Sequence, residues 1–500
     1  MHEIELKLQV PAAQRAAVDA AVAGRAPFRR MRLQAAYHDT AERTLAAAGL
    51  ALRLRREGRQ WVQTLKGATD DGMTRLEHNV PRGATAAMPE IEPALHAGSP
   101  AGDRLAALNG GHREAVLGVL YRTDIRRRTR ALWVRTPGWP QSRVELAFDT
   151  GRIEAGATAL DVCELEIELL AGGPHAVIAT ARRWLPRFGL WLDMRSKAER
   201  GDLLARGETM APPRLAMPLQ LDAGMSAAIA RQRVLRNCAD QILANASQIA
   251  SGEHAPEHVH QLRVGLRRLR SALALFEDEG VDATLNDGAA ALFRRLGAAR
   301  NQVVIEGEFG AELLAAMRSA GLSGEVPPVT PGASEPPASV LRDPAGQATL
   351  LDMLDAMHAD AEPAAAGDAA MLCDRLAARL NDWHRQVVAD AKRYTELDDD
   401  RRHRLRKRAK RLRYATEFCA ALFERRAVRR YLKALRALQE RLGAVSDAVM
   451  AMDAFAQRSA AEPAAMFALG WLAARRDGLI AAAAPALKAF GKVERFWKRS

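Results

Sequence analysis

The N-terminal part of the chain alternates between charged and apolar positions with a period of two. The segment Glu3–Lys7 reads Glu-Ile-Glu-Leu-Lys, and the segment Glu164–Leu169 reads Glu-Leu-Glu-Ile-Glu-Leu. On a β-strand, this alternation directs the charged side chains to one face and the aliphatic side chains to the other. We therefore predict that both segments are strands with one charged face.

Alternation of the same kind predicts further strands nearby. The clearest examples are Leu52–Arg55, Gln60–Lys66, Thr74–Val80, Thr123–Val134, Ser142–Phe148 and Cys163–Leu170. Two helices are also expected, at Gln14–Ala23 and His175–Phe188. About eight mostly antiparallel strands over this length indicate a closed or nearly closed barrel.

The periodicity leaves open whether the charged faces of these strands point outward or inward. Outward is usual for the sheets of soluble proteins, whereas inward faces would line a tunnel with both signs of charge. The carboxylates of Glu164, Glu166 and Glu168 would repel one another unless cations lay between them. The two acidic strands are therefore candidates for one polyvalent metal site.

A change of period divides the chain into two parts. Beyond Pro212, Pro213 and Pro218, apolar residues recur every three to four positions, which is typical of helices. The Pro-, Gly- and Ser-rich stretch 322–346 is expected to be disordered. We predict a multidomain α+β chain with a β domain at residues 1–205, a linker at 206–220 and an all-α domain at 221–500 with a disordered loop near 322–346.

The helical part contains an internal repeat of basic residues, which predicts a duplicated helical bundle. Its copies are His260, Arg263, Arg267, Arg268, Leu269 and Arg270, and His403, Arg406, Lys410, Arg411, Leu412 and Arg413. Leu296-Gly297 and Leu442-Gly443 follow at similar spacing. A helix advances by about 100° per residue, so each copy forms a cationic stripe with its Leu on the opposite side.

The composition narrows the classes of partner. The formal net charge of +13 suits a polyanion such as nucleic acid, polyphosphate or an anionic membrane, although a basic stripe is also typical of a solvated helix face. Trp and Tyr are sparse around the stripes, which argues against base stacking on nucleic acid. The sequence has no uncharged apolar run long enough for a membrane span.

The start of the chain and its cysteines indicate the compartment. Glu3, Glu5 and Lys7 occupy positions where a signal peptide would need an apolar core. Four cysteines lie far apart without paired spacing, which fits a reducing cytosol and gives no zinc signature. We expect a cytoplasmic protein, with association with polyphosphate granules as an open alternative.

These motifs resemble a known pair of domains, the first of which is the CYTH domain of the triphosphate tunnel metalloenzymes. This first resemblance covers residues 1 to about 205, and in that family the charged faces of eight antiparallel strands point inward and line a tunnel. The motifs that carry the resemblance are Glu3–Lys7, Tyr37 with Asp39-Thr40, Leu52–Arg55, Thr64–Lys66, Arg75 with Glu77, Glu145 with Asp149, Glu164–Glu166 and Ser196–Gly201.

The CYTH resemblance implies that basic side chains hold the phosphates of a triphosphate while carboxylates hold Mg²⁺ or Mn²⁺. The implied phosphate ligands are Lys7, Arg53, Arg55, Lys66, Arg75, Arg126 and Arg128, together with Lys197 near the tunnel mouth. The implied metal ligands are Glu3, Glu5, Asp149, Glu164 and Glu166. Glu77 and Glu145 would orient the basic residues.

Residues from about 220 to 500 resemble a CHAD domain through the two basic repeats, Tyr414, Glu417, and Leu442-Gly443 with Asp447. This resemblance implies an α-helical domain whose repeated His, Arg and Lys residues bind inorganic polyphosphate. Arg300-Asn301-Gln302 departs from the acidic pattern expected in the first copy, whereas the second copy keeps Asp447. The first copy is therefore expected to lack an acidic function.

The sequence thus predicts a metal-dependent inorganic triphosphatase, which converts tripolyphosphate to diphosphate and phosphate, fused to a polyphosphate-binding domain. Two alternatives stay open. An adenylate cyclase or a nucleoside or thiamine triphosphatase on the same barrel would need a base-binding pocket, which these motifs do not identify. A non-catalytic polyphosphate-binding or granule-associated protein would have a degraded tunnel, whereas the charged residues of this one are intact.

Overall fold

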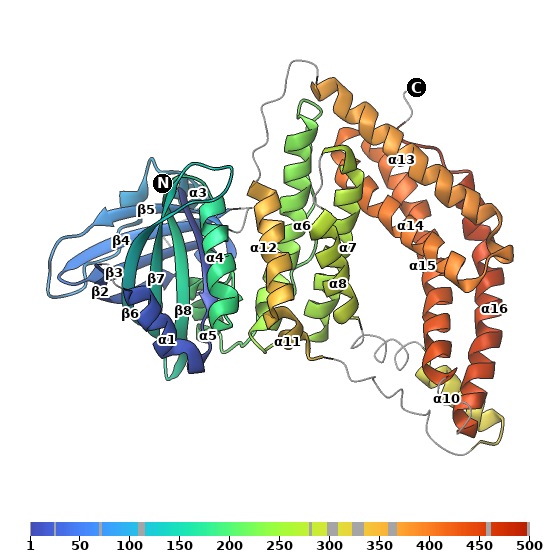
Figure 1. Cartoon of the computed structure of the whole chain (residues 1–500), viewed down its shortest axis with the longest axis horizontal. Helices are drawn as coiled ribbons and strands as arrows, with labels where there is room; N and C mark the ends of the chain where they lie inside the picture. Colours follow the sequence, from blue (N-terminus) through green and yellow to red (C-terminus); the bar gives the residue numbers. More distant parts are fainter. Residues whose placement is uncertain are drawn as a thin grey trace. The chain divides into compact units, whose positions relative to one another are not determined.

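The computed structural model forms two compact units, and Figure 1 labels their elements in chain order. The first unit comprises Met1–Leu215, Ala239–Leu262 and Pro337–Ala359, and the second comprises Ala216–Cys238, Arg263–Pro336 and Asp360–Ser500. The first unit thus joins the predicted β domain to two segments of the predicted helical domain. The described residues are 2–24, 27–69, 73–108, 116–279, 283–297, 309–322, 335–358, 368–456 and 462–497.

Among the described residues of the first unit, eight antiparallel strands close into a barrel (Figure 1). The strand order is β5-β4-β3-β2-β6-β7-β8-β1, and pairing between β1 and β5 closes the ring. This confirms the predicted eight-stranded antiparallel barrel. The strands are β1 (His2–Gln9), β2 (Arg29–Asp39), β3 (Leu50–Glu57), β4 (Gln60–Ala68), β5 (Thr74–Pro81), β6 (Gly118–Val134), β7 (Ser142–Ala155) and β8 (Thr158–Ala171), with the short β9 (Trp191–Leu192) beside β1.

The charged faces of the barrel strands point inward, which answers the question that periodicity left open. The register places Glu5 opposite Glu168 and Lys7 opposite Glu166, so these side chains share the inner face. Leu6, between them, points outward and is fully buried, because α4 (His175–Phe188) packs against β1 and β8. The apolar face of these strands is therefore covered by helices, whereas a second apolar cluster, which includes Leu33, Tyr121 and Ile125, lies on the inner face and lines part of the cavity.

A second helix covers the opposite part of the wall. Leu52 of β3 and Leu65 of β4 form one apolar cluster with Ala101 and Leu105 of α3 (Pro100–Leu108). The predicted helices are confirmed as α1 (Arg15–Ala23) and α4. The first unit also contains α2 (Thr44–Ala47), α5 (Lys197–Ala205), α11 (Pro337–Arg342) and α12 (Pro344–His358), with 3-10 turns at Ala12–Gln14 and Pro93–His96.

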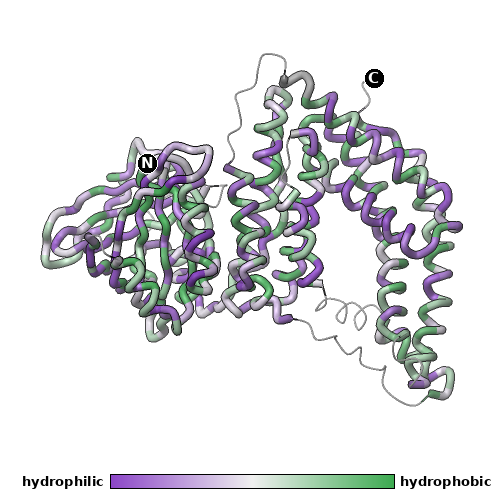
Figure 2. The backbone as a smooth tube through the Cα atoms, viewed as in Figure 1, coloured by the Kyte–Doolittle hydropathy of each residue, from purple (hydrophilic) through white to green (hydrophobic). Residues whose placement is uncertain are grey.

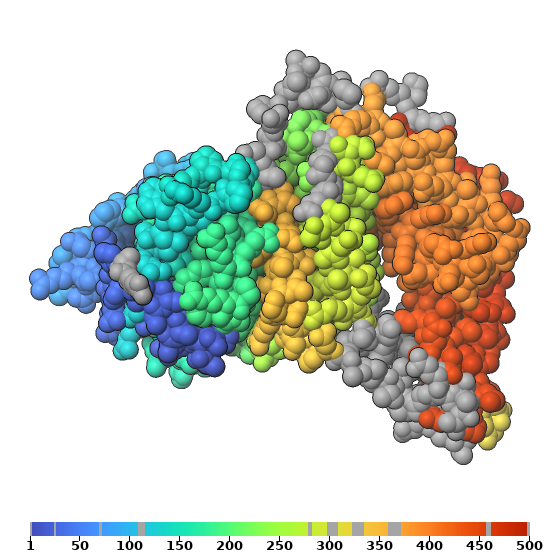
Figure 3. Space-filling model, in the orientation of Figure 1, coloured from blue at the N-terminus to red at the C-terminus, as the bar shows by residue number. Residues whose placement is uncertain are grey.

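Helix α12 packs on α4, although the two are far apart in the sequence. His175 Nδ1 lies 2.6 Å from Asp355 Oδ1, and Arg182 Nη1 lies 2.6 Å from Asp352 Oδ1. Figure 3 shows the two helices adjoining on the surface. The barrel unit therefore includes helices that follow it by more than a hundred residues in the chain.

Helices make up the rest of the described chain, and Figure 2 shows hydrophilic and hydrophobic residues mixed along them. Within the described ranges, no helix is long and apolar enough to cross a membrane. The helices α6 (Ala227–Ala250) and α7 (Pro256–Leu275) contribute residues to both units, and the second unit also has α8 (Ala283–Arg295), α10 (Gly310–Ser319), α13 (Asp368–Lys392), α14 (Asp399–Cys419), α15 (Arg425–Ala456) and α16 (Pro463–Gly491), with 3-10 turns at Glu277–Glu279, Tyr394–Glu396 and Ala420–Leu422.

The prediction of disorder near 322–346 is wrong for the second half of that stretch, which contains helices. Residues 323–334 lie outside the described residues, but α11 and the start of α12 fall within the rest of that stretch. Pro337 and Pro344 stand at the first positions of these helices, where a missing N–H and a fixed φ are tolerated. Two prolines of the stretch therefore begin helices.

Candidate active site in the barrel

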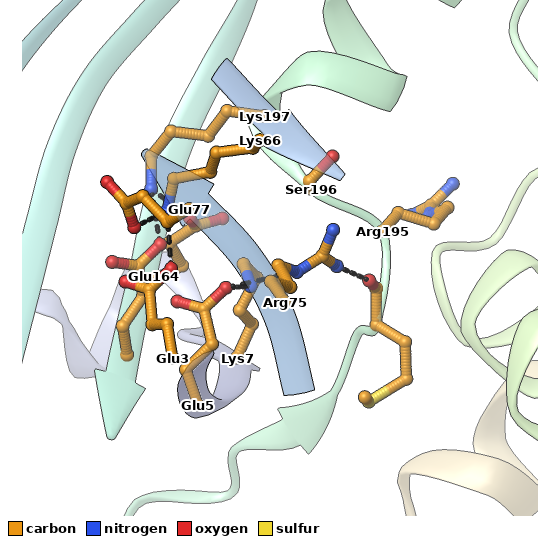
Figure 4. Close-up of polar contacts among 12 residues, drawn as sticks. Glu3, Glu5, Lys7, Lys66, Arg75, Glu77, Glu164, Arg195, Ser196 and Lys197 are labelled. Carbon is orange, nitrogen blue, oxygen red and sulfur yellow. Dashed lines mark hydrogen bonds and ion pairs between the residues drawn. The ribbon is translucent and has the colours of Figure 1, made fainter. Parts of the chain in front are cut away.

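The inner face of the barrel surrounds a cavity of about 910 Å³. Charged residues from most of the strands and from α5 line it, and Figure 4 shows several of them converging. The acidic and basic side chains that line the cavity are Glu3, Glu5, Lys7, Asp39, Arg53, Arg55, Lys66, Arg75, Glu77, Arg127, Asp149, Glu166, Glu168, Arg195, Lys197, Glu199, Asp202 and Arg206.

One side of the cavity combines carboxylates and cations from β1, β4 and β5. Lys66 Nζ lies 2.6 Å from Glu3 Oε2 and 2.9 Å from Glu77 Oε2 (Figure 4). Glu5 contacts Lys7 on its own strand, and Arg75 Nε lies 3.2 Å from Glu5 Oε1. Each cation on this side is therefore held by a carboxylate before any substrate enters.

The other side holds a cluster of three buried carboxylates from β7 and β8, which we call the acidic cluster: Asp149, Glu164 and Glu166. One oxygen of each lies within 4.8 Å of the others. Lys197 Nζ lies 2.7 Å from Asp149 Oδ2 and 2.9 Å from Glu166 Oε1, and it also contacts Glu164. Arg127 donates two hydrogen bonds to Asp149, from Nε to Oδ1 at 2.7 Å and from Nη2 to Oδ2 at 2.6 Å.

Burial and neighbouring charges divide the carboxyl groups into two kinds. Burial raises the pKa of Glu3 to about 8, in spite of Lys66. Burial, with the charges of Glu5 and Glu166, raises the pKa of Glu168 to about 7. For Glu5 and Glu166 burial also favours the neutral form, but Lys7 beside the first and Arg127 beside the second outweigh it, and both pKa values are lowered. The cavity therefore contains permanent carboxylates beside carboxyls that titrate near neutral pH.

The acidic cluster fits a divalent metal ion by its chemistry. All three donors are carboxylates, and Mg²⁺ and Mn²⁺ take oxygen ligands. Buried like charges need a cation near them, and here Lys197 and Arg127 provide it. Burial disfavours an ammonium, but Asp149 and Glu164 raise the pKa of Lys197, so it stays charged.

Two of the predicted phosphate ligands lie outside the tunnel. Arg126 is exposed, and Arg128 bonds the Asp19 carboxylate of α1 at 2.9 Å. The prediction that both face inward is wrong, because Arg127 pairs with the inward Asp149 in the strand register and its two neighbours must point the other way. Three consecutive arginines offer no alternation, so only the register with β7 identifies the inward one.

The other predicted tunnel residues lie at or beside the cavity, although their roles as ligands stay predictions. Arg53 donates to the Tyr37 hydroxyl at 3.1 Å, and Arg55 Nε bonds Glu57 at 2.7 Å. Glu164 lies behind the lining, where Lys197 and Arg200 hold it. Sequence reasoning missed Arg127 and Arg200 as members of the site, and it placed Glu168 on the acidic strand without giving it a role of its own.

Helix α5 brings Lys197 to the acidic cluster. Ser196 is its N-cap and forms a capping box with Glu199: Glu199 N–H donates to Ser196 Oγ at 3.1 Å, and Ser196 N–H donates to Glu199 Oε2 at 2.7 Å. This fixes the first turn of the helix, where Lys197 stands. A Cβ at Gly201 would lie 2.3 Å from the Tyr121 ring, so only glycine permits this approach of α5 to β6.

The two copies of the sequence repeat in the helical region also make similar contacts in the structure. Arg263 Nη1 donates to the Leu296 carbonyl at 2.7 Å and stacks on Phe293. In the second copy, Arg406 stands beside Gly443 and donates to Asp447 at 3.3 Å. Each copy thus sets its first Arg against a Leu-Gly pair, whereas Asn301 of the first copy lies outside the described residues.

The predicted polyphosphate ligands differ in exposure. His403 and Arg270 are exposed, and His260, Arg267, Arg406, Lys410, Arg411 and Arg413 are partly exposed. Arg268 is only 4% exposed and donates to Asn237 at 2.6 Å. Arg411 stacks on Trp383 at 4.2 Å. The buried Arg263 and Arg268 are thus held by the fold.

Two solved structures and one curated relative are similar to parts of the chain. The CHAD domain from the plant Ricinus communis is 29% identical with a TM-score of 0.46, over 56% of this chain and 98% of that one. A Hippeastrum protein reported to have a dominant triphosphatase activity is 19% identical with a TM-score of 0.27, over 42% of this chain and 97% of that one. An inorganic triphosphatase from Haemophilus influenzae is 27% identical over 173 residues, which are 34% of this chain and 44% of that protein. The chain thus spans less than half the length of this curated relative.

Family models account for most of the chain. The model of the CYTH domain matches residues 1–201, and the model of the CHAD domain matches residues 233–456. The first match covers the barrel and most of α5, and the second covers the helices that carry both basic repeats. The chain is therefore a CYTH–CHAD two-domain protein, with an eight-stranded CYTH barrel followed by a helical CHAD region.

Proposed function

We propose that the CYTH barrel hydrolyses inorganic triphosphate to diphosphate and phosphate with the help of Mg²⁺ or Mn²⁺. The observation that carries this proposal is the arrangement of the cavity, in which cations and carboxylates from facing strands converge on one enclosed space. A triphosphate needs many fixed donors, and a metal ion needs oxygen ligands beside them. The Haemophilus relative supports the same activity for the barrel.

The basic side chains would bind the phosphate chain. Arg53, Arg75 and Arg127 offer forked donors that match phosphate oxygens, and Lys7 and Lys66 add ammonium groups. Their present partners are carboxylates and the Tyr37 hydroxyl, so they are already directed into the cavity. Fixed donors of this kind lower the barrier by placing the reacting groups in line and by stabilising the charge of the transition state.

The carboxylates would hold the metal ion. Glu3 and Glu5 on β1, and Asp149, Glu164 and Glu166 of the acidic cluster, are the ligands that we propose. When bound, the divalent cation would neutralise phosphate oxygens and acidify the attacking water. Glu77 and Arg200 would hold Lys66 and Glu164 in place, since each already pairs with them.

We further propose that the CHAD region binds inorganic polyphosphate through its two stripes. The support is the exposed part of each copy, above all Arg267, Arg270, His403 and Lys410. Burial lowers the pKa of His403, and the nearby positive charges of Lys407, Arg406 and Lys410 lower it further. Such clustered positive charges attract a long polyanion.

A substrate panel tests the triphosphatase proposal. The full-length protein is incubated with tripolyphosphate, long polyphosphate, ATP and thiamine triphosphate, each with Mg²⁺ and with Mn²⁺. We expect phosphate release from tripolyphosphate, and about a hundredfold loss in Glu5→Gln. Asp124→Asn is the matched control, because Asp124 pairs with Arg32 on the outer face of β6. Cyclic AMP from ATP would overturn the proposed activity, and a normal rate in Glu5→Gln would overturn the proposed site.

A further inference from the structure

The segment that connects β9 to α5, residues Asp193–Ser196, lies against two tunnel residues. Asp193 N–H donates to the Lys7 carbonyl at 3.0 Å. Arg75 Nη2 donates to the Met194 carbonyl at 3.3 Å, while Nε of the same guanidinium lies 3.2 Å from Glu5 Oε1. This segment, which we call the strap, therefore helps to fix the direction of Arg75 in the cavity.

The strap also sets the start of α5. Ser196 caps this helix, and Lys197 at the first helical position reaches the acidic cluster. Figure 4 shows Arg195, Ser196 and Lys197 in succession, with Lys197 directed toward Glu164 and Arg195 directed away from it. A shift of the strap would therefore move Lys197 and Arg75 together.

Two residues of α6 hold the other side of the strap. Met194 N–H donates to Ser247 Oγ at 2.9 Å, and Arg195 Nη1 donates to Gln248 Oε1 at 3.2 Å. The same Gln248 oxygen accepts from Ala211 N–H at 3.1 Å. Both side chains are 2% exposed. Loss of a buried partner leaves a polar group unsatisfied, which favours movement of the strap.

These contacts join parts of the chain that the family models assign to different domains. Residues 247 and 248 lie within the CHAD match, whereas the strap and most of the cavity lining lie within the CYTH match. They nevertheless belong to one compact unit of the structure, Met1–Leu215 with Ala239–Leu262 and Pro337–Ala359. The CYTH segment alone thus lacks two of the side chains that fix its own strap.

We propose that Ser247 and Gln248 are positioning residues for the tunnel: the CHAD region supplies them, and through the strap they set Arg75 and Lys197. This inference rests on the proposed function, because it gives the two residues an effect on the same reaction. They touch neither the substrate space nor the acidic cluster directly. Their effect passes from α6 to the strap, and from the strap to the charged side chains.

The test compares variants of the full-length protein that differ in what α6 holds. Ser247→Ala and Gln248→Met remove bonds to the strap, and Ser247→Thr keeps the hydroxyl. The matched control is Asn245→Ala, because Asn245 is equally buried on α6 but bonds the backbone of Arg214 in the linker. We expect Ser247→Ala and Gln248→Met to lower kcat on tripolyphosphate about tenfold. Ser247→Thr should restore most of it, and Asn245→Ala should lower Tm without lowering kcat.

Hydrogen exchange separates this inference from the proposed function. Exchange at residues 193–200 should quicken in Ser247→Ala and Gln248→Met, but stay as in the wild type in Asn245→Ala. If the wild-type protein hydrolyses nothing in the panel, the proposed function fails while this measurement still decides whether α6 holds the strap. Unchanged exchange in both strap variants, or an equal loss of kcat in Asn245→Ala, overturns the inference.

Discussion

Arg127 and Asp149 form a two-bond pair inside the barrel, with distances of 2.7 and 2.6 Å, while the neighbours of Arg127 in the sequence lie outside. The pair stands where β6 and β7 are in register, so the strand pairing itself selects which of three arginines faces the cavity. Arg127 also contacts Glu166, and its guanidinium therefore links two members of the acidic cluster.

This relationship predicts opposite results for neighbouring substitutions. Arg127→Gln should lower kcat/KM on tripolyphosphate about a hundredfold, because it removes a fixed donor and leaves two buried carboxylates with less compensation. Arg126→Gln is the matched control, since Arg126 is exposed on the outer face and its loss should change neither kcat/KM nor Tm. Equal rates in the two variants would contradict the assignment of the inner face.

The raised pKa values of Glu3 and Glu168 predict a pH dependence of stability. Below about pH 4.5 both groups are protonated in the folded and unfolded states. Between there and about pH 8 the folded protein keeps protons that the unfolded chain has released, so the free energy of unfolding should fall as the pH rises. Denaturant titrations across this range, with Glu3→Gln for comparison, should show a weaker slope in the variant.

Stabilisation by a bound metal ion should increase as the pH rises, which is opposite to the trend without metal. A divalent cation needs deprotonated carboxylates, so binding is opposed by the protons that Glu3 and Glu168 hold. The increase in Tm caused by Mg²⁺ should therefore be larger at about pH 9 than at about pH 6. An increase that is independent of pH would show that Glu3 does not take part in the metal site.

Substitution of Lys197 tests the acidic cluster. Lys197→Met removes the ammonium that lies between Asp149 and Glu166, so the negative charge of the cluster is then less compensated and favours a metal ion. We expect tighter Mn²⁺ binding in calorimetry, a lower Tm in the presence of a chelator, and a reduced kcat. Lys488→Met is a suitable control, because Lys488 is exposed on α16. Weaker Mn²⁺ binding in Lys197→Met would mean that the ammonium does not compete with the metal ion.

The helical stripes should divide into binding residues and structural residues. Arg267→Ala and Lys410→Ala should weaken retention on long polyphosphate and reduce its salt dependence, by about 0.7 in the logarithmic slope for each lost phosphate contact. Arg268→Ala should instead lower Tm, because Arg268 is buried against Asn237 and Phe418. Unchanged retention in the first two variants would move the binding surface elsewhere.

The sequence predicted the barrel because alternation on each strand is a local property. The structure has the closed ring of strands and the two helices, α1 and α4, that the sequence predicted. The direction of the charged faces required the family resemblance, since alternation is the same for both directions. Physically, α3 and α4 decide it by covering the apolar face.

The candidate site was predicted less completely than the fold. That Glu5 and Lys7 share a face can be predicted from the alternation along one strand. That Arg127 faces the cavity depends on the register between β6 and β7. The contact of Ser247 with the strap could not be predicted, because the sequence around a Ser on a helix does not indicate which distant group its hydroxyl will bond. Contacts between distant segments are set by tertiary packing, which spacing along the chain does not report.

The placement of the apolar residues has a consequence for how this barrel can change. Because Leu6 and Leu65 pack outward beneath helices, much of the free energy that keeps the strands together comes from side chains that do not line the cavity. Exchanging one charged residue of the inner wall for another leaves that layer intact. The barrel can therefore acquire a different anion preference by substitutions inside the wall that keep the buried charges paired, because the outer apolar layer still holds the strands together.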